Sequence, residues 1–179
     1  MSDAAARGEP PGGPAGGSGS GREYPARPIV GVGAVVVHEG QVLLTRRGRE
    51  PGRGEWTLPG GAVRTGERLR AAVARELEEE TGLAVQVGPV VGLFERIVPD
   101  AAGRVRYHYV LVDFLCRIAP GAAATLRVGG DCAEGRWVPA HDLGGLPVTA
   151  ATREVVAKAL AIAEGRGGGS VADLLLDGG

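Results

Sequence analysis

The chain has 179 residues and a formal net charge of −1, which favours a single domain and provides no overall positive field that would attract nucleic acid. Hydrophobic residues make up 44% of the sequence, enough for a core, yet no run approaches the roughly 18 consecutive apolar residues of a membrane span. Cys116 and Cys132 cannot form a disulfide framework, and the N-terminus lacks the basic start and apolar run of a secretory signal, so we expect a reducing, cytoplasmic location.

Both ends of the chain have the composition of disordered tails. Ala, Gly, Pro and Ser dominate residues 1–27, which offer too few large apolar groups to offset the entropy lost on ordering. We therefore expect a disordered tail over residues 1–27, a folded domain over 28–163 and a flexible tail over 164–179. Within the second tail, the run 171–176 could form a loosely docked helical turn or stay unstructured.

The folded part begins with the pattern of a β-hairpin. Val30–Val37 is apolar and β-branched, the turn residues Glu39 and Gly40 follow it, and a second run covers Gln41–Arg46. A polar, glycine-rich loop is expected over 47–55 and a short strand over 56–58.

Helices and strands then alternate without a regular order. A helix is expected over Glu67–Thr81, where Gly82 stops it, and a second over Thr149–Ala163, with Thr149 or Thr152 as N-cap. The strands are expected in 83–98, which supplies one or two, and in 106–117 and 135–138, with a turn at 100–103. This order predicts an α+β fold in which helices sandwich a mixed β-sheet.

The first helix departs from the usual amphipathic pattern. At about 100° per residue, Leu69, Ala72 and Val73 share one face that should pack on the sheet. Further along, the same face carries three carboxylates in place of apolar groups: Glu76, Glu79 and Glu80. Such a patch repels itself and is costly to bury unpaired. It is either a solvated acidic face or a site for a hard cation such as Mg²⁺, which prefers clustered carboxylate oxygens.

The segment before this helix suits the same kind of site. The loop Pro59-Gly60-Gly61 would let backbone atoms approach a metal ion or a phosphate closely, although a simple turn explains it equally well. Glu67 is expected in the first helical turn, where a carboxylate also suits the helix dipole.

These residues together match a known motif. Gly61, Glu67, Arg75-Glu76-Leu77, Glu79-Glu80 and Gly82-Leu83 resemble the Nudix box, with nine specified positions filled over 23 residues and no departure. The flanking strands extend the similarity from about Pro28 to Ala163. The resemblance implies the Nudix fold, a mixed sheet between helices in which the box forms a loop-helix-loop motif.

The resemblance also implies a metal-dependent activity. Members of the family use water to attack phosphorus in a nucleoside diphosphate linked to another group, with Mg²⁺, or alternatively Mn²⁺, as cofactor. By similarity Glu76, Glu79 and Glu80 would ligate the metal, the Gly60 carbonyl would add a backbone ligand, and Glu67 would support the site or bind a further ion.

Two further roles follow from the same similarity. Arg75 would hold the carboxylates in place through Glu79 or Glu67. The general base would be Glu79, Glu80 or an acid outside the box. For that acid we expect Glu134, at a loop position just before the strand of Trp137, with Asp131 as its competitor.

The substrate is less strongly indicated. The runs 93–97 and 107–111 are similar to a bacterial ADP-ribose pyrophosphatase-like branch of the family, which favours ADP-ribose or a related nucleoside diphosphate derivative. Four residues are expected to contact substrate, although each has an ordinary surface or sheet role as its alternative: Arg46, Arg47, Arg96 and His108. Tyr107 and Tyr109 alternate with His108, so one set faces the core and the other the cleft.

Alternatives to this function stay open. A nucleoside triphosphate pyrophosphohydrolase, including one for oxidised nucleotides, is the first, and a non-catalytic nucleotide-sensing module is the second. The expected partner is a nucleotide-derived small molecule, without nucleic acid or membrane, and self-association as a homodimer is left open.

Overall fold

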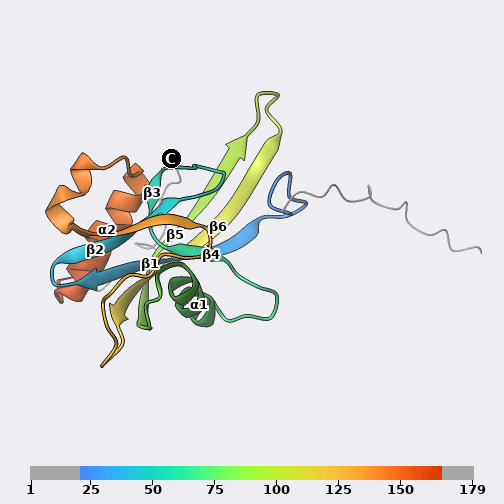
Figure 1. Ribbon diagram of the computed structural model, residues 1–179. Coiled ribbons are helices and arrows are strands. Elements are labelled where there is room, and N and C mark those ends of the chain that lie inside the picture. Colours follow the sequence, from blue (N-terminus) through green and yellow to red (C-terminus); the bar gives the residue numbers. More distant parts are fainter. Residues whose placement is uncertain (1–20, 167–179) are drawn as a thin grey trace, which may run out of the picture.

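A computed structural model describes residues 21–166, which form a mixed seven-stranded β-sheet with helices packed on it (Figure 1). The elements in chain order are β1 (Ile29–His38), β2 (Gln41–Arg47), β3 (Trp56–Thr57), β4 (Gly60–Ala62), α1 (Leu69–Thr81), β5 (Val85–Pro99), β6 (Val105–Ile118), β7 (Cys132–Pro139), η1 (Ala140–Gly145) and α2 (Ala150–Ala163). Strand β1 pairs in parallel with β6, and the other pairings are antiparallel. The predicted α+β class with a mixed sheet is confirmed.

The β1–β2 hairpin follows the sequence pattern. His38 pairs with Gln41 across a two-residue turn, in which Glu39 has φ 49° and Gly40 has φ 74°. Positive φ at both turn positions matches the right-handed twist of the flanking strands. This turn fixes the register in which β2 continues toward the loop 48–55.

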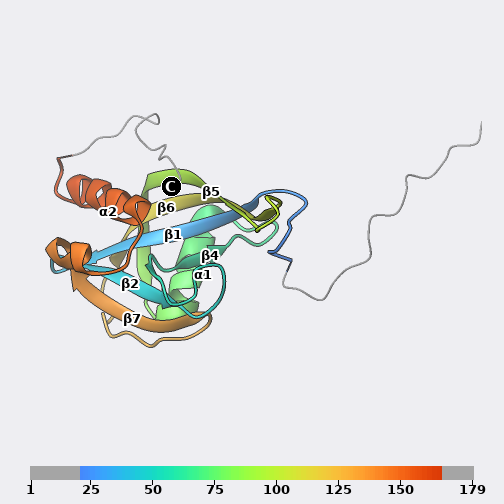
Figure 2. The same ribbon diagram turned by 90° about the horizontal axis from the view of Figure 1, so that it is seen from above.

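Alternation along β1 divides the core between the two helices. Val32, Ala34 and Val36 point to one face of the sheet, where they pack with residues of α1, while Val35 points to the other face and packs with residues of α2. The two helices therefore cover opposite faces (Figures 1 and 2). None of the helices within residues 21–166 has the length and apolar character needed to span a bilayer.

Helix α1 begins later than expected and buries a different face. It starts at Leu69, so Glu67 lies before the helix and not in its first turn. Leu69 is exposed, contrary to the prediction that it packs on the sheet. The buried face consists of Ala72, Val73, Leu77 and Thr81. The helix ends as predicted at Gly82, whose φ of 70° suits glycine.

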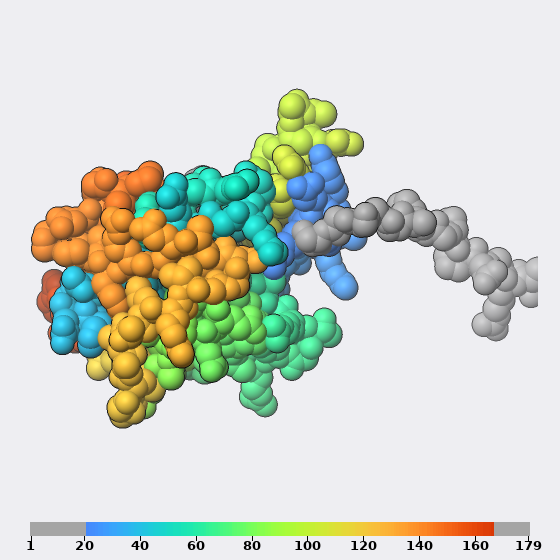
Figure 3. All heavy atoms as spheres, in the orientation of Figure 1, coloured from blue at the N-terminus to red at the C-terminus, as the bar shows by residue number. Residues whose placement is uncertain are grey.

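Residues 21–27 are held against the domain, in contrast to the predicted disordered tail. The Tyr24 amide donates to the Arg106 carbonyl at 2.8 Å, and the Tyr107 hydroxyl donates to the Glu23 carboxylate at 2.7 Å. Figure 3 shows this segment, in blue, packed against the yellow-green end of the β5–β6 hairpin. Composition alone missed this contact because it depends on partners about 80 residues away.

The C-terminal half agrees with the expected order but not with every boundary. The expected region of one or two strands over 83–98 corresponds to the single long strand β5, which runs from Val85 to Pro99, and β7 begins at Cys132, three residues earlier than predicted. Thr149 is the N-cap of α2, since its hydroxyl accepts from the Thr152 amide at 3.1 Å. The predictions for residues 1–20 and for 167–179, including the run 171–176, lie outside the described residues.

Candidate functional site

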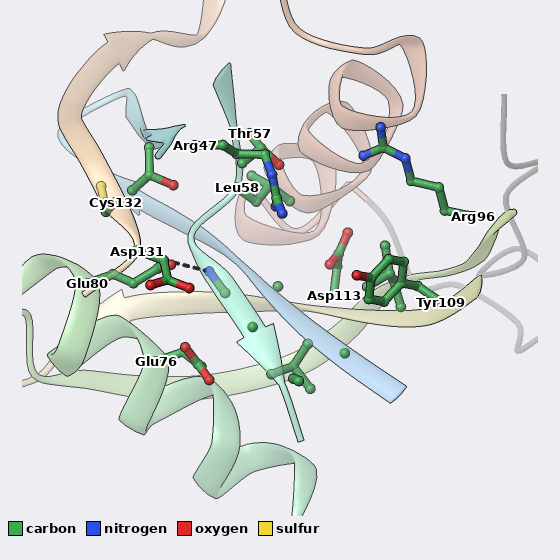
Figure 4. Close-up of a pocket in the computed structure, with 18 of the residues that line it drawn as sticks. Arg47, Thr57, Leu58, Glu76, Glu80, Arg96, Tyr109, Asp113, Asp131 and Cys132 are labelled. Atoms are coloured by element: carbon green, nitrogen blue, oxygen red, sulfur yellow. Dashed lines mark hydrogen bonds between the residues drawn. The ribbon is translucent and has the colours of Figure 1, made fainter. Parts of the chain in front are cut away.

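A cleft of about 500 Å³ opens beside α1 and extends across β1 to the α2 face of the sheet (Figure 4). This volume lies in the range usual for small-molecule sites. It is lined by residues of α1, of the loop before β4, of the strands β5 and β6, and of the segment 130–132. Figure 4 shows two ends, with Glu76, Glu80 and Asp131 on one side and Asp113 and Tyr109 on the other.

The acidic end is formed where α1 packs against the loop 59–61. Glu80 accepts a hydrogen bond from the Gly60 amide at 3.0 Å. A Cβ built on Gly61 would lie 2.5 Å from the Cδ of Glu76, closer than van der Waals contact allows. Glycine at this position therefore lets the helix carboxylate approach the backbone.

Arg75 gathers the carboxylates around itself. Its guanidinium donates to both oxygens of Glu67 at 2.7 and 2.9 Å, to Glu76 at 2.6 Å and to Glu79 at 3.2 Å. Hydrogen bonds from Arg75 hold the pKa of Glu67 at about 2, and those from Glu67 raise the pKa of Arg75. The contacts predicted for Arg75 with Glu67 or Glu79 are both present, and Glu76 is an additional partner.

Glu80 occupies a more buried environment. Burial, assisted by the negative charges of Glu76 and Asp131, raises its pKa to about 7, although the Gly60 hydrogen bond and the charge of Arg47 oppose the shift. The carboxyl thus lies among groups that disfavour its negative charge. A nearby cation would reverse that preference.

The donors at this end suit a hard divalent cation, although their present arrangement is that of a salt-bridge network. Within residues 21–166 no three His, Cys, Asp or Glu side chains are gathered closely enough to hold a metal ion, because Arg75 and the Gly60 amide hold the carboxylates. The donors are nevertheless oxygens on adjacent turns of one helix, facing a glycine backbone, and these are ligands that Mg²⁺ prefers.

The structure corrects the position of Glu134. Because β7 begins early, Glu134 lies within that strand and opposite Arg46 of β2, not in a loop. Its carboxylate accepts from Arg136 at 2.9 Å and lies 3.8 Å from Arg46. Glu134 is absent from the cleft lining, whereas its competitor Asp131 is part of it. Asp131 lies beside the box carboxylates, since its charge acts on the pKa of Glu80.

The expected substrate-binding residues separate into two groups. Arg46, Arg47 and Arg96 line the cleft, and His108 does not. Strand alternation places His108 on the face opposite to Tyr109, where its Nε2 lies 3.5 Å from the Glu95 carboxylate. The cleft side of β6 is therefore the tyrosine side, and the prediction for His108 is wrong in its placement.

Sequence reasoning missed Asp113 at the other end of the cleft. This residue lines the cleft from the middle of β6 and is only 3% exposed. Its Oδ2 has no hydrogen-bond partner, and burial raises the pKa of the carboxyl to about 7. The available signal was one acidic residue inside the apolar run 110–115 of an expected strand.

The sequence matches the family model described as the NUDIX domain over residues 27–159. An ADP-ribose pyrophosphatase of Methanocaldococcus jannaschii is 32% identical over 131 residues, which cover 73% of this chain and 72% of that protein. The low-salt glycan biosynthesis protein Agl8 of Haloferax volcanii is 42% identical over 89 residues, or 49% of this chain and 57% of that protein.

A solved structure shows the same architecture. The crystal structure of a MutT NUDIX hydrolase from Burkholderia pseudomallei has a TM-score of 0.62 and 33% sequence identity to this chain. The match covers 74% of this chain and 98% of that one. It therefore extends over nearly the whole of the solved protein.

Proposed function

The chain belongs to the Nudix family and is a Nudix-type pyrophosphohydrolase, and from this we propose that it uses a divalent metal ion to cleave an ADP-ribose-like nucleoside diphosphate derivative. Mg²⁺ is the proposed cofactor, with Mn²⁺ as the alternative. The observation that carries the proposal is the cluster of box carboxylates on one wall of a cleft whose other end is lined by aromatic and apolar side chains.

The metal would be held by the acidic end of the cleft. Glu76, Glu79 and Glu80 would supply carboxylate oxygens, the Gly60 carbonyl a backbone oxygen, and Glu67 would support the site or bind a further ion. When bound, divalent ions neutralise the diphosphate and lower the pKa of a coordinated water.

The protein groups have separate tasks around the scissile bond. Arg75 holds Glu76 and Glu79 in orientation through its hydrogen bonds, and Arg64 also donates to Glu79 at 3.0 Å. A carboxylate accepts the proton of the attacking water. The candidates for this base are Glu79, Glu80 and, outside the box, Asp131, which now replaces Glu134 because it lines the cleft.

The shape of the cleft supports a diphosphate that bridges two groups. Arg47 and Arg96 enter from opposite walls, on β2 and β5, and could contact phosphate oxygens between the two ends (Figure 4). Tyr109 and Phe94 provide aromatic surface at the end away from the carboxylates. The related M. jannaschii protein is named an ADP-ribose pyrophosphatase, which also supports this substrate class.

A nucleoside triphosphate is the second candidate substrate. Seven arginines line the cleft. Arg64 and Arg75 pair with box carboxylates, and the other five could supply the cationic end that a triphosphate requires: Arg22, Arg46, Arg47, Arg49 and Arg96. Carboxylates lie near four of these five, since Arg22 and Arg49 pair with Asp131, Arg46 approaches Glu134 and Arg96 approaches Glu55. This partial neutralisation favours the diphosphate derivative.

The test is a substrate panel with chromatographic separation of products. ADP-ribose, other nucleoside diphosphate derivatives and nucleoside triphosphates are incubated with Mg²⁺, with Mn²⁺ and with EDTA. Cleavage of ADP-ribose should yield AMP and ribose 5-phosphate, whereas a triphosphate would yield a monophosphate and pyrophosphate. Turnover that persists in EDTA would refute the metal requirement, and binding without turnover of any compound would favour the sensor alternative.

A further inference from the structure

Asp113 is a buried carboxyl inside the cleft that the proposed metal chemistry does not use. It lies on β6, on the same strand face as Leu111 and Leu115, and at the end of the cleft opposite Glu76 and Glu80 (Figure 4). No Arg, Lys or His contributes to its pKa, which burial alone raises to about 7. An unpaired polar group at this depth destabilises a folded protein unless a ligand completes its hydrogen bonds.

The neighbouring strand leaves room for this carboxyl. Gly33 of β1 stands directly opposite Asp113 in the parallel ladder, and Gly31 stands opposite Leu111. A Cβ at Gly33 would overlap the Oδ1 of Asp113, and one at Gly31 would lie 2.7 Å from the Leu111 side chain. Two glycines in a central strand provide no side chains for packing, and here they create the hollow that the Asp113 and Leu111 side chains occupy.

The chemistry of this hollow limits what can bind in it. A phosphate offers only acceptor oxygens and negative charge, so it is a poor partner for a carboxyl. The partner must bring an N–H or O–H donor. A sugar would set its remaining hydroxyls against Leu58, Phe94 and Leu111, which line the same cleft. A nucleobase instead presents apolar faces to such side chains and its polar atoms along one edge.

We propose that Asp113 recognises the base of the substrate, by hydrogen bonding an adenine-type edge in which an amino group adjoins a ring nitrogen. A carboxyl that keeps its proton near neutral pH offers one donor and one acceptor side by side. The amino group and the ring nitrogen offer the complementary pair. This proposal rests on the proposed function, since it assigns the nucleoside end of the same cleft.

The test compares the adenine-containing diphosphate that the wild type hydrolyses fastest with its counterpart in which hydrogen replaces the 6-amino group, since hypoxanthine would still offer the carboxyl one donor and one acceptor. Asp113→Asn preserves shape and keeps one donor and one acceptor, so KM and base preference should stay within about threefold of wild type. Asp113→Leu removes both, and should raise KM for the adenine substrate by about tenfold or more while kcat changes by less than about threefold. The preference for adenine should also be lost.

Controls separate this proposal from instability and from the metal chemistry. Asp142→Asn changes an exposed carboxylate of η1 outside this cleft and should leave every constant unchanged. Thermal unfolding should show that Asp113→Leu is folded. If it is not, Gly33→Ala provides a second variant, because its Cβ would displace the Asp113 carboxyl and should raise KM in the same way.

A readout without turnover separates failure of this proposal from failure of the proposed function. AMP should raise the unfolding temperature of the wild type more than purine riboside 5′-monophosphate, which lacks the amino group, does, and this difference should vanish in Asp113→Leu. The proposal is overturned if Asp113→Leu retains wild-type KM and base preference, if only kcat falls, or if the wild type does not prefer the adenine substrate over its counterpart without the amino group. Absence of hydrolysis together with a preserved AMP effect would overturn the proposed function alone.

Discussion

Replacement of Asp113 by Asn should stabilise the ligand-free protein, and the stabilisation should grow with pH. Burial raises the pKa of this carboxyl from an ordinary 3.8 to about 7 in the folded protein. The folded chain therefore holds the proton more tightly than the unfolded chain does. Below about pH 4 the carboxyl is neutral in both states, so the substitution has no charge to remove.

The magnitude follows from the separation of the two pKa values. Between about pH 4 and pH 7 the unfolded chain releases the proton while the folded chain retains it, so the wild type loses about 1.4 kcal/mol of unfolding free energy per pH unit. Above the folded pKa the loss levels off at about 4 kcal/mol. Because the side chain is only 3% exposed, solvent screening reduces this value little.

Urea unfolding at pH 5 and pH 8, followed by tryptophan fluorescence, measures the effect. The gain in unfolding free energy of Asp113→Asn over wild type should be larger at pH 8 than at pH 5 by about 3 kcal/mol. Asp142→Asn serves as the matched control, because its exposed carboxylate should give no pH-dependent difference. Equal gains at both pH values would show that the folded-state pKa of Asp113 is ordinary, and would refute the reasoning.

Three further predictions concern the chemistry. Glu79→Gln and Glu80→Gln each remove an anionic oxygen ligand and should lower Mg²⁺-dependent turnover by at least about a hundredfold. The free energy of unfolding should stay unchanged, and wild-type turnover in either variant would contradict the ligand assignment. Asp131→Asn should lower kcat and change the acidic limb of the pH–rate profile, whereas Glu134→Gln should match wild type in both, and the reverse result would restore Glu134 as the outside acid. ADP-ribose should exceed every common or oxidised nucleoside triphosphate in kcat/KM at equal Mg²⁺, and a triphosphate preferred by more than about tenfold would overturn the substrate choice.

Local sequence patterns predicted the parts of the fold that depend on near neighbours. The hairpin turn at Glu39-Gly40, the end of α1 at Gly82 and the N-cap at Thr149 each rest on residues within one turn of the position concerned. The acidic face of α1 was also visible, since helical periodicity alone places Glu76 and Glu80 on one side. Identification of the box then indicated the chemistry at this end of the cleft.

The errors arose where the outcome depends on contacts between distant segments. Glu134 was expected in a loop, but β7 starts early because Cys132 and Glu134 pair with Arg47 and Arg46 of β2. His108 was expected to contact substrate but does not line the cleft, because alternation gives the relative directions of neighbouring side chains and not which side meets the cleft. That side is determined by the pairing of β6 with β1, where the glycines of β1 leave space opposite Leu111 and Asp113.

The pairing of Gly33 with Asp113 also bears on where substrate choice resides. Glycine inside a strand lowers stability by roughly 0.5–1 kcal/mol relative to alanine, and an unpaired buried carboxyl lowers it further. The two residues depend on each other, since a Cβ at position 33 would overlap the carboxyl of Asp113. A ligand that hydrogen-bonds Asp113 would offset both losses. The box carboxylates can serve any diphosphate, so selection between nucleosides must come from residues such as these at the opposite end of the cleft.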